Sequence, residues 1–153
     1  MRPSARHTKG LTVALLLASF AGFLDAVYLT AEHYLGRVPP CTILNGCERV
    51  TTSVYSTVAG IPLALLGALY YLAVFILALI VLDTGRLVFV RWIVALTTFG
   101  FLVSLGLVYL QLFVLHALCI YCLFSVLTTT IAFAVSLALP RRESPSPPLP
   151  ADR

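Results

Sequence analysis

Four cysteines, arranged as two closely spaced pairs, are the residues of this sequence best suited to chemistry. Cys41 and Cys47 are separated by a segment that contains the turn-forming pair Asn45-Gly46, so their thiols can meet in a disulfide. Closing so short a loop contributes only about 2.4 kcal/mol through chain entropy, and most of that would order the loop itself. A purely structural crosslink is therefore the weaker interpretation of this pair.

The second pair, Cys119 and Cys122, forms a C-x-x-C motif at the expected start of a helix. A helix N-terminus places free N–H groups and the positive end of the helix dipole near the first sulfur, and both lower the pKa of that thiol. His116, just before the motif, could stabilise the thiolate further as an imidazolium. Cys122 lies one turn deeper, in more apolar surroundings. Such a pair can exchange with a disulfide above it and face a lipid-soluble oxidant beside it.

Four cysteines in a membrane protein could also serve three other uses. No His follows the C-x-x-C motif, which excludes a c-type haem attachment site. Four thiolates could hold a zinc ion, but an oxidising compartment is a poor place to keep them reduced, so we predict no metal site. Cysteines in membrane helices can also be simple small apolar residues, although two close pairs argue against this.

The elements that must position these cysteines are membrane helices. Of 153 residues, 60% are hydrophobic and 10% are charged, and the mean hydropathy is +1.01, so lipid must cover most of the surface. The N-terminal apolar run is too long for the apolar core of a signal peptide, so we expect it to be retained as a membrane helix. Basic residues are not interleaved with aromatic ones, which argues against nucleic-acid binding. We predict an all-α membrane protein, a four-helix bundle, with spans at about 11–35, 61–82, 88–115 and 118–139.

Basic residues beside the spans predict the orientation. Seven Lys and Arg residues lie on one side, in the N-terminal tail, the 83–91 loop and residues 141–142, against two on the other, Arg37 and Arg49. By the positive-inside rule both termini are cytoplasmic, and all four cysteines lie on the extracytoplasmic, oxidising side. We predict a membrane domain over 1–140 and a disordered cytoplasmic tail, rich in Pro and Ser, over 141–153.

Taken in this order on this topology, the motifs resemble the vitamin K epoxide reductase family, specifically its bacterial disulfide-forming branch. The resemblance covers about Leu11 to Leu139. It rests on the two cysteine pairs, on Val50 and Ser53 after the loop pair, and on the sequence Gly60-Ile61-Pro62-Leu63. It implies a four-helix bundle around a quinone in the bacterial inner membrane, with a loop and half-helix lid between the first two spans.

The resemblance also implies a reaction. A DsbA-like, thioredoxin-fold partner outside the cytoplasm, acting in trans, would deliver electrons to Cys41 and Cys47. They would pass to Cys119 and Cys122, and then to menaquinone or ubiquinone, with Cys122 facing the quinone. The residues expected at the quinone pocket are Ser53, Leu63, Leu66, Tyr70 and Val126. The vertebrate branch has an Asn and a Tyr at the positions of Leu63 and Val126, which puts epoxide reduction in doubt.

Asp25 is the only carboxylate expected well inside a span. Ionisable residues at that depth usually face the bundle interior, so it could supply protons to a quinone or bond to Tyr28 or Thr30 as structure.

Two rival functions remain. A DsbB-type enzyme also has four spans and two cysteine pairs, but carries the pairs in the reverse order. A non-catalytic membrane scaffold, or a metal-binding module with four thiolates, is the alternative from another class.

Overall fold

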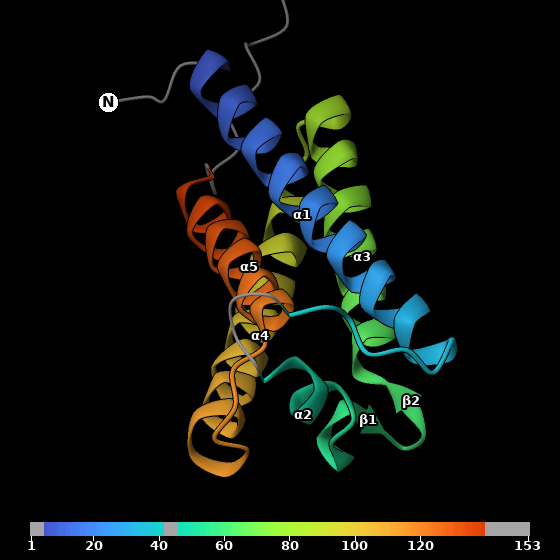
Figure 1. Cartoon of the computed structure of the whole chain (residues 1–153). Coiled ribbons are helices and arrows are strands. Elements are labelled where there is room, and N and C mark those ends of the chain that lie inside the picture. The colour runs from blue at the N-terminus through green and yellow to red at the C-terminus, as the bar shows by residue number, and fades with distance from the viewer. Residues whose placement is uncertain (1–4, 42–45, 140–153) are drawn as a thin grey trace, which may run out of the picture.

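Four long helices dominate the computed structural model, which describes residues 5–41 and 46–139 (Figure 1). They are α1 (Ala5–Tyr34), α3 (Leu63–Thr84), α4 (Leu87–Tyr109) and α5 (Ile120–Ala138). Each contains a stretch long and apolar enough to cross a membrane. The all-α fold with four spans is therefore confirmed. The third span continues beyond α4 into a π-helical turn, η2 (Leu110–Val114).

A short segment between α1 and α3 folds over one end of the bundle. Its elements are the helix α2 (Cys47–Thr51), a single 3₁₀ turn η1 (Val54–Ser56) and the strands β1 (Thr57–Val58) and β2 (Ile61–Pro62). We call residues 35–41 and 46–62 the lid. The end of the bundle that the lid covers is called the cysteine end. The start of α1 and the end of α5 lie at the opposite end (Figure 1). The predicted lid with a half-helix is confirmed.

The start of the second span differs from the prediction in one respect. A span that begins at about residue 61 places Pro62 in the first helical turn, where proline is well tolerated, but in the structure Pro62 precedes Leu63 as the capping residue and pairs with Thr57 across the hairpin. The turn of this hairpin has positive φ at both central residues, Ala59 (50°) and Gly60 (80°), which matches the right-handed twist of paired strands. The chain therefore enters α3 from a strand, and the helix begins after the proline.

The bundle core is made by apolar side chains from all four long helices, including Leu15, Val74, Ile93 and Ala132. In this core α1 packs against α3 and α5, and α4 packs against the same two helices. Large apolar side chains such as Leu17, Trp92 and Phe99 are exposed instead, as expected where lipid is the solvent.

Small residues and hydroxyl groups join the helices inside the bundle. Gly22 of α1 makes room for the ring of Tyr71, and Gly100 of α4 makes room for the ring of Tyr70. The Tyr71 hydroxyl lies 2.7 to 2.9 Å from the side-chain oxygens of three α5 residues, Ser125, Thr128 and Thr129. Hydrogen bonds of this kind hold helices together where the hydrophobic effect is absent.

Basic side chains lie at both ends of the bundle. Arg86 and Arg91 lie at the end of the bundle opposite the lid, whereas Arg37 and Arg49 lie at the cysteine end. The predicted cytoplasmic tail, residues 141–153, lies outside the described residues, as does Arg2. The described arginines are thus arranged as the sequence predicted.

Candidate functional site

The loop cysteines are joined in a disulfide within the lid. Cys41 and Cys47 have Cα atoms 6.0 Å apart, an ordinary separation for a disulfide. Cys47 is the first residue of α2 and is 1% exposed, whereas Cys41 is only half-buried. Asn45, which was expected to make the turn between them, lies outside the described residues. The two sulfurs therefore differ in access, with Cys41 nearer to solvent.

The lid rests directly on the turn that leads into α5. A Cβ atom added to Gly46 would lie 2.6 Å from both the backbone nitrogen and the backbone oxygen of Leu118, so only glycine permits this approach. Further along, the Tyr121 hydroxyl donates a hydrogen bond to the Pro40 carbonyl at 3.2 Å. These contacts hold the disulfide segment against the C-x-x-C motif and the residue just before it.

Cys119 is fixed from the other side by Gln111. The Cys119 side chain is fully buried, and its backbone N–H donates to the Gln111 Oε1 atom at 3.0 Å. The Gln111 carbonyl also accepts the N–H of Ala117 at 3.0 Å, and His116 between them has a left-handed φ of 46°. Gln111 belongs to the π-helical turn η2, and such turns are frequent at functional sites.

The two thiols of the C-x-x-C motif are free and interact with each other. A hydrogen bond from the Cys122 thiol lowers the pKa of Cys119 to about 6, and backbone N–H groups at the start of α5 add to this effect. Burial of the sulfur opposes it. The predicted effect of a helix start on Cys119 is thus present, although the neighbouring thiol contributes more. His116 is exposed and is not among the causes of this shift.

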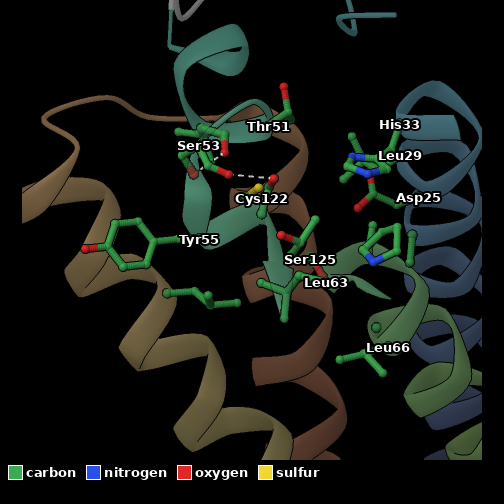
Figure 2. A pocket seen from close by; sticks show the side chains of 18 of the residues that line it. Asp25, Leu29, His33, Thr51, Ser53, Tyr55, Leu63, Leu66, Cys122 and Ser125 are labelled. Carbon is green, nitrogen blue, oxygen red and sulfur yellow. Dashed lines mark hydrogen bonds between the residues drawn. The ribbon is translucent and has the colours of Figure 1, made fainter. Parts of the chain in front are cut away.

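A cavity of about 800 Å³ lies between the lid and the four long helices (Figure 2). Cys122 lines it, but Cys41, Cys47 and Cys119 do not. The residues expected at a quinone pocket all line this cavity: Ser53 from the lid, Leu63, Leu66 and Tyr70 from α3, and Val126 from α5. One sulfur of the C-x-x-C motif therefore faces the cavity, while the other is buried beside the lid.

Most of the cavity wall is apolar, and two polar atoms in it lack partners. The Oδ2 atom of Asp25 and the hydroxyl of Tyr70 are buried without a hydrogen bond among the described residues. Thr30, one of the structural partners considered for Asp25, instead donates to the Ala26 carbonyl at 2.7 Å. Tyr28, the other, packs its ring on that of Tyr121, with centroids 5.4 Å apart. Asp25 and Tyr70 both line the cavity, so each brings an unpartnered polar group to its wall.

The sequence did not single out Gln111 or the contact of Gly46. Gln111 was visible as a lone amide near the end of an apolar span, which is a usable signal, but nothing in the spacing connects it to Cys119. Within the described ranges, no three His, Cys, Asp or Glu side chains are grouped as metal ligands.

One comparison with known proteins assigns this arrangement to a family. The sequence model of the vitamin K epoxide reductase family matches residues 13–137, a range that includes most of the first span, nearly all of the fourth, the whole second and third spans, the lid and both cysteine pairs. The matched range is most of the chain, and the resemblance to this family inferred from the cysteine motifs is confirmed at the level of the family. This chain belongs to the vitamin K epoxide reductase family.

Proposed function

We propose that this membrane oxidoreductase reoxidises an extracytoplasmic thioredoxin-fold protein and passes the electrons through its two cysteine pairs to a membrane quinone. The observation that carries the proposal is the division of the C-x-x-C motif. Cys119 is buried beneath the disulfide-bearing lid, whereas Cys122 lines the cavity. Electrons that enter at one sulfur can therefore leave at the other.

The first step is thiol–disulfide exchange between the partner and the lid. A thiolate of the partner attacks one sulfur of the Cys41–Cys47 disulfide, and resolution of the mixed disulfide leaves the partner oxidised and both loop cysteines as thiols. The greater exposure of Cys41 favours it as the sulfur that meets the partner. Buried Cys47, next to the contact of Gly46 with Leu118, is then the sulfur that faces the C-x-x-C motif.

The second step moves the electron pair inward. A loop thiolate attacks Cys119 of the oxidised C-x-x-C pair, Cys122 leaves as a thiolate and takes up a proton, and the second loop thiol resolves the mixed disulfide. The products are the loop disulfide and the Cys119–Cys122 dithiol, which is the state described above. Because the pKa of Cys119 lies near 6, this sulfur is mostly a thiolate at neutral pH and is activated for the next oxidation.

The cavity residues fit a quinone. Leu63, Leu66 and Val126 offer an apolar wall, and the unpartnered Tyr70 hydroxyl can donate a hydrogen bond to a carbonyl oxygen. A bound quinone supplies an acceptor of two electrons and two protons. The protein's own contribution is to present the Cys122 sulfur to the cavity and to keep water from Cys119. Menaquinone and ubiquinone both satisfy this description.

The orientation belongs to the same proposal. Arg86 and Arg91, at the end opposite the lid, support placing that end in the cytoplasm of a bacterial inner membrane. The lid and both cysteine pairs then face the oxidising compartment, where the thioredoxin-fold partner acts in trans.

Expression in bacteria that lack their own quinone-coupled disulfide generator tests the proposal. With a thioredoxin-fold partner supplied, the wild-type chain should restore disulfides in exported proteins, and Cys119→Ala and Cys122→Ala should not. Asp83→Asn, an exposed change at the far end of α3, serves as the matched control and should rescue fully. Equal rescue by all variants would contradict the proposal. A purified protein that retains zinc and does not reduce quinone would instead favour the thiolate metal-binding alternative.

A further inference from the structure

The half-buried carboxyl group of Asp25 has no role in the exchange steps described above, yet it lines the same cavity as Cys122. Its Oδ2 atom is buried and lacks a hydrogen-bond partner among the described residues. Leaving such a group unpaired inside a membrane protein costs free energy, and ionisable residues there usually mark a pathway for ions or protons. Figure 2 shows Asp25 projecting from α1 into the space in front of Cys122 and Ser125.

Asp25 is also the innermost member of a stripe on α1 whose outer members, Glu32 and His33, are polar and whose middle member, Leu29, is apolar. Leu29, Glu32 and His33 follow it at four, seven and eight residues, so all four lie on one helix face and all line the cavity. The stripe rises about 12 Å along the helix axis from Asp25 to His33. His33 is exposed at the cysteine end, so the cavity that contains Asp25 reaches the surface there.

The balance of protons shows why such a group is needed. Reducing a quinone to the quinol consumes two electrons and two protons. Oxidation of the dithiol to the disulfide supplies the two electrons. With Cys119 as a thiolate and Cys122 as a thiol, the pair supplies both electrons but only one proton. The sulfur–sulfur bond forms, the S–H bond of Cys122 breaks, and one proton must come from elsewhere.

We propose that the Asp25 carboxyl donates this second proton into the cavity and is reprotonated from the cysteine end along the face of α1 that carries Glu32 and His33. The inference rests on the proposed function and identifies the proton route of that same site. Water within the cavity must bridge the spaces between the side chains, because the stripe is longer than a direct hydrogen bond. A proton taken up on the extracytoplasmic side would then accompany each quinone reduced.

The test must distinguish the effect of Asp25 from the effects of the other titratable groups that face this cavity. They are Glu32, His33 and Arg37 from α1 and the segment after it, Tyr55 from η1, Tyr70 and Tyr71 from α3, and Cys122 from α5. Among the lining residues, α4 and η2 add only uncharged polar groups, Ser104 and Gln111. Asp25 is the one carboxyl group of the set with a buried oxygen that lacks a hydrogen-bond partner.

The test compares single and repeated turnover in the full chain, purified in lipid nanodiscs and reduced before a soluble ubiquinone analogue is added. Asp25→Asn should slow formation of the Cys119–Cys122 disulfide about a hundredfold, at the lower end of what a positioned general acid contributes. Asp25→Glu, which keeps a carboxyl group, should lose far less, and Asp83→Asn should match the wild type. The double variant Glu32→Gln/His33→Gln should retain the first turnover and slow later ones about tenfold.

Infrared spectroscopy of the quinone-free protein gives a readout that does not depend on activity. The difference spectrum between wild type and Asp25→Asn should contain the C=O band of a protonated carboxyl group, shifted in Asp25→Glu and absent from the Asp83→Asn difference. If the wild type reduces quinone and Asp25→Asn does so equally fast, or if the band is missing, the proton route is refuted and the proposed function stands. If the wild type does not reduce quinone at all, the proposed function itself fails, whatever the infrared result.

Discussion

The contact of Gly46 with the turn before α5 can be tested by adding a single methyl group. The backbone of Gly46 has φ −103° and ψ −5°, a conformation open to alanine, so Gly46→Ala introduces no backbone strain. Its Cβ atom would lie 2.6 Å from the backbone nitrogen and oxygen of Leu118, whereas ordinary contacts begin at 3.4 Å. The lid and the turn must therefore move apart by about 0.8 Å, since backbone atoms cannot rotate away.

This displacement should act on exchange between the two cysteine pairs. Displacing reacting groups by about 1 Å can slow a reaction about a hundredfold, so Gly46→Ala should lower the exchange rate by roughly ten- to a hundredfold. Both disulfides should still form, because neither pair is altered. Cys119 should also become more accessible, since the contact that helps to bury it is loosened.

The assay starts from protein whose C-x-x-C pair is oxidised and whose loop pair is reduced. Samples are quenched with acid at increasing times, the thiols are alkylated, and peptide masses report which pair holds the disulfide. Gly106→Ala is the matched control, because no atom lies within 4 Å of the added Cβ atom at that helical position. Unchanged exchange and unchanged alkylation of Cys119 in Gly46→Ala would refute the view that this contact sets the approach of the two pairs.

Three further predictions concern the support of the site. Gln111→Leu leaves the Cys119 N–H unpaired, which should lower the free energy of unfolding by about 1–3 kcal/mol. Gln111→Glu keeps an acceptor oxygen and should lower it less. Denaturation in detergent measures the stability of both variants. Tyr71→Phe removes a hydroxyl that bonds to three α5 side chains and should cost about 1–2 kcal/mol, seen as a lower Tm. The ultraviolet absorbance of the Cys119 thiolate in the reduced protein, measured against Cys119→Ala, should rise with pH and be half-maximal near pH 6. Cys122→Ala should move this midpoint upward by removing the donor. A midpoint unchanged by Cys122→Ala would contradict that cause.

The membrane spans could be predicted from the sequence because few backbone structures are possible in lipid. A run of about 20 apolar residues in a bilayer must close its backbone hydrogen bonds within itself, so span length and helix type follow together. The cavity-lining residues Leu63, Leu66 and Tyr70 of α3 were expected from the family resemblance, and their spacing of three and four residues explains why they share a helix face. Pro62 was misplaced by a residue because the strand pairing of the hairpin, rather than helix propensity, decides where α3 begins.

The support of Cys119 could not be predicted in the same way. Gln111 lies eight residues before Cys119, a spacing that no regular helix brings into contact, and the π-helical turn with the reversal at His116 makes the contact possible. The role of Gly46 depends on how closely two backbones approach, which is a property of the packed structure. A turn signal in the sequence identified this glycine for another reason, its place beside Asn45.

The arrangement around Cys119 explains how a protein could connect a soluble partner to a membrane quinone without letting them react directly. Cys119 is enclosed by the lid on one side and by Gln111 on the other, and its sulfur is inaccessible to solvent. A partner large enough to meet Cys41 cannot reach it, and the cavity that would hold a quinone is lined by Cys122 alone among the four cysteines. Under the proposed function, every electron pair must therefore cross both cysteine pairs in order. Loosening either side of this enclosure should permit direct oxidation of the loop thiols by quinone before it abolishes activity.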